Sequence, residues 1–487
     1  MSKEYKIHSV QYNFIMNVIL KMSTVIFPFI TFPYVSRVLG AAGNGKIAFT
    51  SSIISYFTLM ACLGIPTYGI RACARYRDNK QKLNKVVKEL LIILAVTTTI
   101  AYLAFFVCFI CVPKFREEQT LMLMYSISIL LTSFGVEWFY QAIEQYDYIT
   151  FRNLAFKVIS IVLMFLLVKT SDDYLIYGFI SILGGIGSNI LNILRLRKYV
   201  DFKEKTELDI LIHVRPIITL FMLSAASMIY TNLDSVMLGF LTDNTEVGYY
   251  NAAVKLKNIL LNFVTALGVV VLPRITNHLA KKEHNEVNKL LRKSFNYVLI
   301  SSLSLTIYCC VEARDCIMFL AGEGYEPAIL GMQLISPSII FIGLSNVIGL
   351  QILIPTEREN HTLISTIIGA IVDVALNVIL IPKYGNAGAA LATTIAELCV
   401  LTYQIIIVRK EIYQYLDIRN IIKILLSIII AVIVLFVVFA IIKFSNSFLN
   451  ILLSGTVFFA SFGISLLIMK EDTIFDLFQS VLKKIKK

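Results

Sequence analysis

Polar side chains recur at helical spacing within the first apolar stretch of the sequence. Asn13, Asn17, Lys21 and Thr24 follow one another at intervals of four, four and three residues. This spacing places all four side chains on one face of a helix. An ammonium group beside amides and hydroxyls can hold an anionic, hydroxylated ligand through hydrogen bonds. The pattern therefore predicts that this face lines a wet site for a polar, negatively charged ligand.

A second polar face of the same kind lies in the second half of the sequence, where asparagines surround Lys255 at the same spacing. Lys257 falls two residues further on and would point away from this face. Lys157 is another lysine within an apolar stretch, and Arg37 is either a ligand-binding residue or a topology anchor. The alternative for the lysines is that they snorkel to the membrane surface. The predicted substrate-binding side chains are Lys21, Asn17, Thr24, Arg37, Lys157, Asn251, Lys255, Asn258 and Asn262.

Three carboxylates within the apolar stretches form a separate set, Asp234, Asp373 and Glu397. A charged side chain at the centre of a bilayer costs roughly 2.5–3.5 kcal/mol, so such residues are functional candidates. A carboxylate at this depth can take up a proton or a sodium ion. We therefore predict that these three residues couple transport to an ion. The alternative is a structural hydrogen bond between helices.

The sequence contains no motif of a known catalytic site. Its five histidines lie in tails, in loops or at helix ends, and we expect no carboxylate to be matched to them. There is no P-loop, which excludes a built-in ATPase of that type, and no GxSxG motif. We therefore predict a protein that is not an enzyme and that uses no cofactor and no metal.

Membrane-spanning helices must position these side chains. Of the 487 residues, 57% are hydrophobic and only 16% are charged, whereas about 25% are charged in an ordinary soluble protein. Apolar stretches long enough to cross about 30 Å of hydrocarbon recur along the whole chain. The sequence thus predicts an all-α polytopic membrane protein. The fourteen predicted helices are 14–36, 47–70, 90–112, 120–144, 152–168, 174–194, 216–241, 249–272, 295–311, 328–354, 362–381, 385–407, 422–442 and 448–469.

The basic residues predict the orientation of these helices. With both termini in the cytoplasm, 32 of the 44 lysines and arginines fall in cytoplasmic segments, 8 in external loops and 4 within helices. Cytoplasmic loops of membrane proteins carry such an excess. The net charge of +12 therefore indicates topology and contact with anionic lipid, and we expect no nucleic-acid partner.

Short matches at nearly constant offsets indicate an internal duplication. Leu63-Gly64 recurs as Leu267-Gly268, and residues 84–87 resemble residues 288–291, both at an offset of 204. Each copy would hold six helices and start in the cytoplasm, so an axis along the membrane normal would relate two six-helix lobes. Helices 13 and 14 have no counterpart. The predicted domains are an N-terminal lobe (1–205), a C-terminal lobe (206–412), and a segment with two extra helices and a basic tail (413–487).

Several turns resemble signature segments of a known family. Residues 37–45 (RVLGAAGNG) resemble its turn between helices 1 and 2, and residues 234–239 with 247–253 resemble its helix 7–8 signature. Residues 322–328 (GEGYEPA) and 384–390 resemble the turns before helices 10 and 12. On these segments the chain resembles the polysaccharide flippases, which export O-antigen and capsule repeat units, of the multidrug/oligosaccharidyl-lipid/polysaccharide exporter superfamily.

The resemblance implies a bacterial cytoplasmic-membrane carrier that acts as a monomer. Its substrate would be an undecaprenyl-diphosphate-linked oligosaccharide, moved from the cytoplasmic to the external leaflet. Two lobes would alternate access without ATP. The carboxylates within the predicted helices would take up the proton or sodium ion that drives the cycle. The main alternative is a multidrug efflux antiporter of the same superfamily, for which the lysines are unfavourable. A membrane-bound polysaccharide polymerase is a further alternative, although the predicted external loops are short for a catalytic site.

Overall fold

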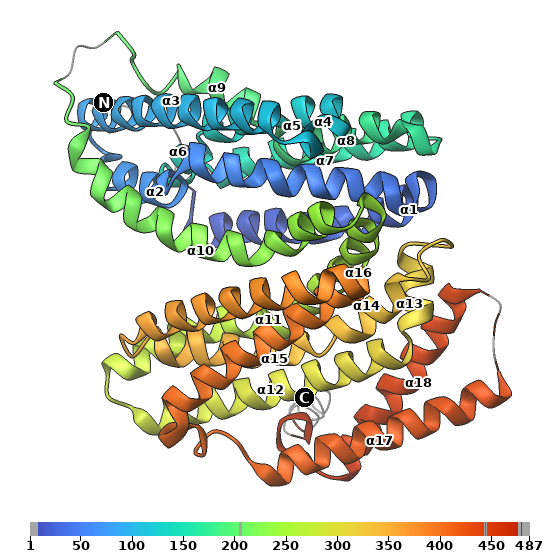
Figure 1. The fold of residues 1–487 in the computed structure, drawn as a ribbon. Coiled ribbons are helices and arrows are strands. Elements are labelled where there is room, and N and C mark those ends of the chain that lie inside the picture. Colours follow the sequence, from blue (N-terminus) through green and yellow to red (C-terminus); the bar gives the residue numbers. More distant parts are fainter. Residues whose placement is uncertain (1–7, 204–206, 443, 445, 476–478, 480–487) are drawn as a thin grey trace. The chain divides into compact units, whose positions relative to one another are not determined.

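In a computed structural model, the described residues are 8–203, 207–442, 444, 446–475 and 479. Every element within them is a helix, which confirms the all-α prediction. The chain divides into two compact units, Met1–Gly248 and Tyr249–Lys487. Figure 1 follows the chain from blue in the first unit to red in the second. Each unit is a set of packed helices.

The first unit begins with a very long helix and ends with another long one. Its elements are α1 (Val10–Cys62), α2 (Ile65–Tyr76), α3 (Lys80–Cys111), α4 (Pro113–Glu117), α5 (Gln119–Ser133), α6 (Glu137–Ala142), α7 (Tyr146–Leu167), η1 (Ser171–Asp173), α8 (Tyr174–Ile182), η2 (Leu183–Gly187), α9 (Asn189–Leu196) and α10 (Leu211–Leu241).

The second unit contains the remaining helices, the first of which begins shortly before the boundary. Its elements are α11 (Asn244–Ala280), α12 (His284–Val311), α13 (Ala313–Leu320), α14 (Ala328–Ile335), α15 (Ser338–Asn346), η3 (Val347–Leu353), α16 (Glu359–Ile412), α17 (Ile418–Ile441) and α18 (Ser447–Ile468).

The helices cover the fourteen predicted stretches but divide them differently. Within the described residues, ten helices are long and apolar enough to cross a membrane, or eleven if the bent pair Ser171–Gly187 and Asn189–Leu196 forms one span. Two of the four missing spans arise because α1 and α16 each join two predicted helices, and the other two are the bent pair and α10, of which only Leu211–Met222 is found as a shorter apolar helix. Helices α1 and α16 contain 53 and 54 residues, or about 80 Å of helix, against about 30 Å of hydrocarbon.

Glycines allow the chain to turn inside both long helices. Gly40 has φ 65° and ψ −176°, and Gly385 has φ 53° and ψ −129°. These backbone angles are strained for residues with a Cβ atom. The two glycines stand at the turns that the sequence predicts between helices 1 and 2 and between helices 11 and 12. Each long helix is therefore kinked where a membrane protein would reverse direction.

The boundary between the compact units follows α10 rather than preceding it. A Cβ atom on Gly64 would lie 2.4 Å from the Ile217 carbonyl oxygen, so the turn before α2 approaches the backbone of α10 closely. Helix α10 also packs along α1. The sequence assigns α10 to the second lobe on the basis of the duplication, which is a different criterion from compactness. The predicted repeat therefore stays a prediction.

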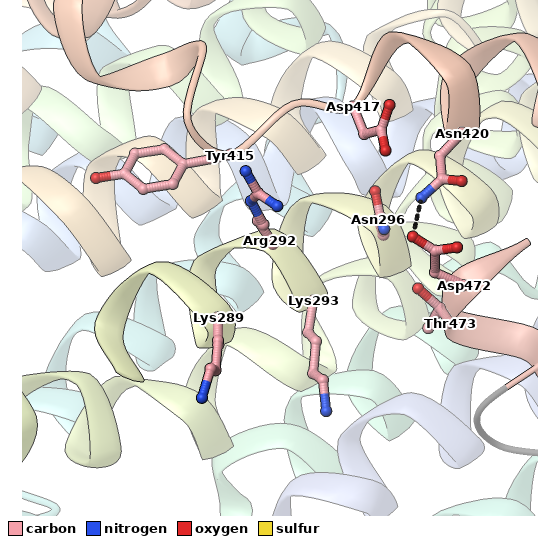
Figure 2. A pocket seen from close by; sticks show the side chains of 9 residues that line it. All are labelled: Lys289, Arg292, Lys293, Asn296, Tyr415, Asp417, Asn420, Asp472 and Thr473. Atoms are coloured by element: carbon pink, nitrogen blue, oxygen red, sulfur yellow. Dashed lines mark hydrogen bonds between the residues drawn. The ribbon is translucent and has the colours of Figure 1, made fainter. Parts of the chain in front are cut away.

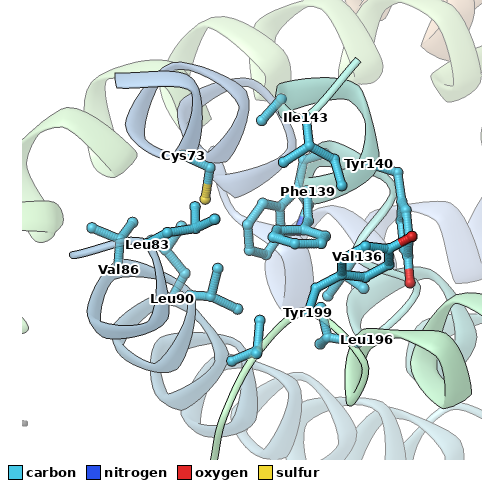
Figure 3. Close-up of a cluster of buried hydrophobic side chains, with 14 of the residues drawn as sticks. Cys73, Leu83, Val86, Leu90, Val136, Phe139, Tyr140, Ile143, Leu196 and Tyr199 are labelled. Carbon is cyan, nitrogen blue, oxygen red and sulfur yellow. The ribbon is translucent and has the colours of Figure 1, made fainter. Parts of the chain in front are cut away.

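A hydrophobic cluster holds α2, α3 and α6 together in the first unit (Figure 3). Leu90, Phe139 and Tyr140 are fully buried in it. Trp138 packs on α2 because Gly69 has no side chain there: a Cβ atom would lie 2.6 Å from the indole ring. Burying one such large side chain stabilises the fold by about 1.5–3 kcal/mol. This cluster fixes the end of the unit that contains the basic segment 71–89, which is the predicted cytoplasmic end.

Candidate functional site

A polar cluster in the first unit joins α1, α6 and α7. The Lys157 ammonium group donates a hydrogen bond of 2.7 Å to the Ser23 hydroxyl oxygen. Lys157 is half-buried. Its partner Ser23 is not among the predicted residues. A neutral hydroxyl does not compensate the charge of a lysine, so Lys157 can still attract an anion.

A second cation of this cluster is almost fully enclosed. The Arg152 side chain is 2% exposed, and its Nη2 lies 3.0 Å from Oε2 of Glu137. Gln141 donates a hydrogen bond of 3.2 Å to the other Glu137 oxygen. The Nε and Nη1 atoms of Arg152 have no hydrogen-bond partner among the described residues. Because a buried guanidinium normally pairs all its donors, this group has spare capacity for an acceptor.

The polar face of α1 lines a pocket of about 380 Å³ at the predicted cytoplasmic end of the same unit. Asn13 donates a hydrogen bond of 3.2 Å to Glu144, which also forms an ion pair with Arg77. Asn17 and Gln141 line the pocket beside this pair. The predicted ligand-binding residue Asn17 thus faces a polar space. Sequence reasoning misses Arg77, because in the sequence it reads as one more charge of a basic loop.

The other residues predicted on or near α1 are exposed. Lys21 and Thr24 lie on the surface of the unit, where the Thr24 hydroxyl donates a hydrogen bond of 2.6 Å to the Lys21 carbonyl oxygen. Arg37 is also exposed, and its Nη1 lies 2.5 Å from the Pro33 carbonyl oxygen. The structure therefore brings Asn17 and Lys157 to enclosed polar surroundings within the unit, but not Lys21, Thr24 and Arg37.

A hydroxyl-lined pocket of about 260 Å³ lies elsewhere in the first unit. Ser51, Ser55 and Thr58 line it from one face of α1, and the Tyr125 hydroxyl lies 2.6 Å from the Ser181 hydroxyl at its wall. Such a surface offers hydrogen bonds without charge. The intervals of four and three residues along α1 are the signal that could have predicted it.

In the second unit, the predicted polar face of α11 is partly exposed. Asn251 and Lys255 are half-buried, whereas Asn258 and Asn262 are exposed. Lys257, which the spacing predicts to point away from that face, is the most buried of these five side chains, at 8%. Lys257 thus exposes less of its surface than Lys255, although the spacing predicts that it points away from the polar face.

The three predicted ion-coupling carboxylates are all buried. Asp234 is 4% exposed in the first unit, and Asp373 and Glu397 are 1% and 7% exposed in the second. Thr393, one turn before Glu397, lies 3.1 Å from the Tyr250 hydroxyl. Buried carboxylates need partners or protons, which fits either of the roles considered for them. No group of three or more metal-ligating side chains occurs among the described residues.

A further pocket of about 200 Å³ lies at the predicted cytoplasmic end of the second unit (Figure 2). Asn420 donates a hydrogen bond of 3.0 Å to Asp472 there. Burial raises the pKa of Tyr415, which lies between α16 and α17. The charges of this pocket are mixed, because cations of α12 face carboxylates that follow α16 and α18. Its charged residues are Lys289, Arg292, Lys293, Asp417 and Asp472.

The sequence model of the family described as "Polysaccharide biosynthesis protein" matches residues 10–279, more than half of the chain. The chain belongs to this family. The resemblance to the polysaccharide flippases of the exporter superfamily is thereby confirmed. The matched segment includes α1, α6 and α7, and therefore the polar cluster described above.

Relatives of known name extend the similarity over most of the chain. A protein of Escherichia coli (strain K12) named "Putative O-antigen transporter" is 23% identical over 407 residues, which are 83% of this chain and 97% of the relative. The "Lipid II flippase MurJ" of Bacillus subtilis (strain 168) is 20% identical over 454 residues, 81% of this chain and 82% of the relative. These relatives are named as transporters and flippases, and neither name is that of an enzyme family.

Two solved structures share the fold. The lipid II flippase MurJ in an inward closed conformation matches with a TM-score of 0.73 at 19% identity, over 95% of this chain and all of that one. An inward-facing multidrug resistance MATE transporter of the MOP superfamily matches with a TM-score of 0.58 at 14% identity, over 82% of this chain and 98% of that one. Together with the apolar helices, these matches establish a multi-pass membrane protein with a MurJ-like fold.

Proposed function

We propose that this protein is a flippase for lipid-linked oligosaccharides, and specifically that it moves undecaprenyl-diphosphate-linked repeat units from the cytoplasmic to the external leaflet of a bacterial cytoplasmic membrane. The observation that carries the proposal is the polar cluster with the buried Arg152 and the half-buried Lys157 inside the first unit of a family member. The names of its relatives, O-antigen transporter and lipid II flippase, support the same substrate class.

The cluster has the chemistry that a diphosphate requires. Moving an unpaired phosphate into a low-dielectric interior is prohibitively costly, so cations must accompany it. Arg152 has two N–H groups without partners among the described residues, and a guanidinium binds phosphate oxygens in bidentate geometry. Lys157 supplies a second charge from the same helix. Glu137 keeps Arg152 compensated when no substrate is bound.

The uncharged part of the substrate has a matching surface in the first unit. Sugars present hydroxyl groups that bind well to serine, threonine and tyrosine side chains. The wall of the pocket around Ser51, Ser55, Thr58 and Tyr125 is mostly apolar. The serine and threonine hydroxyls donate to carbonyl oxygens of α1 and would serve sugars as uncharged acceptors. A lipid tail can stay in the membrane while the head group crosses. The exposed apolar side chains of α17, such as Ile433 and Phe436, offer it a surface.

We further propose that the predicted α1 and α11 faces contribute to the transport path. Lys21, Thr24, Arg37, Asn258 and Asn262 are exposed on their own units, as side chains that meet a polar substrate would be. Alternating access of two six-helix lobes would then expose these faces to each side of the membrane in turn. Fourteen spans would follow if the chain reverses direction at Gly40 and at Gly385 and if the bent pair and α10 each cross the membrane once. Both termini would then lie in the cytoplasm, and the unit of function would be a monomer.

Ion coupling is assigned to the buried carboxylates. Asp234, Asp373 and Glu397 avoid lipid, and protonation or sodium binding would remove their charge during part of the cycle. Binding of the ion favours one conformation over another by the difference between its binding free energies in the two conformations. Asp234 lies in the first unit and Asp373 and Glu397 lie in the second, so each unit would respond to the same gradient.

Transport into sealed vesicles would test the proposal. The full chain is reconstituted in proteoliposomes with fluorescent undecaprenyl-diphosphate oligosaccharide, and a membrane-impermeant quencher reports how much label has changed leaflet. We expect faster leaflet exchange than in protein-free vesicles, and acceleration by a proton or sodium gradient. Exchange at the protein-free rate, together with uptake of a cationic dye against a gradient, would instead support the multidrug alternative.

A further inference from the structure

A basic pocket of about 440 Å³ lies at the predicted cytoplasmic end of the first unit, apart from the polar cluster of α6 and α7. It is formed by α2, α3 and the start of α10. Within the described residues, Arg71, Arg75 and Lys82 form no salt bridge. Arg75 and Lys82 approach the Tyr76 ring from two helices, at 5.7 and 5.8 Å from its centroid. Three cations therefore converge on one space, and none of the three is paired with a carboxylate among the described residues.

The carboxylate that lines the pocket, Glu89, is held by hydrogen bonds to other groups. Glu89 is fully buried, and its two oxygens accept hydrogen bonds of 2.8 Å from His213 and 2.6 Å from the Asp209 backbone N–H. The other His213 nitrogen lies 2.7 Å from the Tyr68 hydroxyl. The expectation that no carboxylate is matched to a histidine is therefore wrong, because the fold brings α3 and α10 together across 124 residues of sequence. This network fixes the floor of the pocket and leaves its cations available.

The rim of the pocket is apolar where α10 begins. Leu211 is 81% exposed and Ile212, which lines the pocket, is 57% exposed. Apolar side chains beside a cationic pocket match a molecule with a phosphate head and a hydrocarbon tail. Basic pockets on the cytoplasmic side of membrane helices bind such head groups. A soluble phosphate compound would gain nothing from this exposed apolar rim.

We propose that this pocket binds the phosphate group of a membrane lipid at the cytoplasmic leaflet, with Arg71, Arg75 and Lys82 as its main ligands. The lipid is bound and not transported at this site. Lys85 stands 3.8 Å from Glu89 and contributes less, because its charge is shared with that carboxylate. The proposal is independent of the transported substrate, since it concerns a different pocket and a different measurement.

Native mass spectrometry of the purified full-length protein would test the site. The protein is equilibrated in detergent with equal amounts of phosphatidylglycerol and phosphatidylcholine, and retained lipid is counted. Each removed cation should weaken binding about fivefold, so Arg75→Gln with Lys82→Gln should lower phosphatidylglycerol retention about 25-fold. The matched control is Lys289→Gln with Lys293→Gln at the mixed-charge pocket of the second unit, where we expect less than a twofold change. All four side chains are exposed, and an unchanged thermal unfolding midpoint would verify folding.

Two further measurements distinguish a phospholipid from other phosphate compounds that the pocket could bind. Undecaprenyl diphosphate without sugar, in place of phosphatidylglycerol, would show whether the carrier lipid also occupies the pocket. Inorganic pyrophosphate is titrated by calorimetry into the wild type and into the double variant. We expect no binding in the wild type that is lost in the double variant. Equal lipid retention by the wild type and the double variant would overturn the proposal, as would pyrophosphate binding that requires Arg75 and Lys82. The single variant Arg71→Gln leaves the Tyr76 contacts intact and should still reduce retention about fivefold.

Discussion

The Lys157 ammonium group of α7 lies 2.7 Å from the Ser23 hydroxyl oxygen of α1, although 134 residues separate them in sequence. The hydrogen bond joins the helix that begins the first unit to the helix that carries Arg152. Ser23 neutralises no charge, so the contact positions Lys157 without compensating it. Substitutions of Lys157 and of Ser23 therefore distinguish a structural role of this hydrogen bond from a substrate-binding role of Lys157.

Replacing Lys157 should impair transport, whereas replacing Ser23 should not. Lys157→Ala removes a charge that the diphosphate needs, and we expect transport to fall at least tenfold, with partial recovery in Lys157→Arg. Ser23→Ala removes the hydrogen bonds to Lys157 and to the Leu20 carbonyl oxygen, each worth about 1 kcal/mol of stability, and should leave transport within twofold. The assay is label exchange in proteoliposomes at matched protein abundance. Lys169→Ala, in an exposed turn, is the control; normal transport by Lys157→Ala would remove this lysine from the mechanism.

The two ends of the Glu137–Arg152 pair should differ in their effect on stability. Arg152 is 2% exposed but Glu137 is 35% exposed, so water can solvate the carboxylate but not the guanidinium. Glu137→Gln should cost about 3 kcal/mol because it leaves a buried charge unpaired, whereas Arg152→Gln should cost about 1 kcal/mol. Thermal unfolding in detergent would show this difference as a larger drop in midpoint for Glu137→Gln. Equal drops would mean that Arg152 is hydrated.

The more stable of these variants should be the less active one. If Arg152 binds phosphate, Arg152→Gln should fold nearly as well as the wild type and yet lose most of its transport. A folded Arg152→Gln protein with normal transport would assign the pair to stability alone.

Helical periodicity predicts part of this site because it needs only local information. It predicts the polar face of α1, and Asn17 indeed lines a pocket. It cannot predict Ser23, whose role depends on α7, or Arg152, which in the sequence resembles a topology charge at the end of a stretch. Their partners are set by how α1, α6 and α7 pack, and packing is not encoded in the spacing along any one helix.

For the fold as well, the sequence predicts features that depend on neighbouring residues but not those that depend on contacts between distant helices. Apolar length predicts the helical stretches because each must satisfy its own backbone groups in lipid. It does not predict that α1 and α16 continue through their turns, because Gly40 and Gly385 bend the chain within a few residues. The assignment of α10 to the first compact unit likewise depends on its contact with the turn at Gly64. Neither feature has a signal in hydrophobicity alone.

A side chain at Gly40 should be destabilising through backbone strain alone. An added Cβ atom would meet no other atom within 4 Å, so Gly40→Ala has no clash to relieve. The backbone angles there are nearly exclusive to glycine and should cost about 1–3 kcal/mol. Gly463→Ala is the matched control, because it also has open space but lies in a regular helix. Unfolding midpoints should fall for Gly40→Ala and stay constant or rise for Gly463→Ala; equal midpoints would contradict the strain.

Neutralising the buried carboxylates should uncouple transport from its driving ion. Asp373→Asn and Glu397→Gln keep the shape of each side chain but cannot take up a proton or a sodium ion. We expect normal membrane abundance, because each change removes a costly buried charge, and loss of acceleration by an imposed gradient. Glu357→Gln, at an exposed turn, should respond to the gradient like the wild type. Gradient-driven exchange that persists in both variants would leave these carboxylates with a structural role.

The two lysines of the predicted polar faces of α1 and α11 should both act in transport even though they differ in burial. Lys21 is exposed on the first unit and Lys255 is half-buried in the second. If both line the path, Lys21→Gln and Lys255→Gln should each lower export of surface polysaccharide about tenfold, and arginine should partly restore it. If both snorkel to the membrane surface, glutamine and arginine should be equivalent. Quantifying surface polymer against membrane abundance separates these outcomes.

The contact between Trp138 and Gly69 gives the protein an intrinsic optical probe. Trp138 is the single tryptophan of the chain, and it is 5% exposed. A buried indole emits at shorter wavelength than one in water, so its emission reports whether α2 and α6 stay in contact. No label is needed to follow the contact between α2 and α6 while substrate or an ion gradient is added. Emission that stays constant through turnover would mean that the two helices move as one body, and a red shift would time their separation.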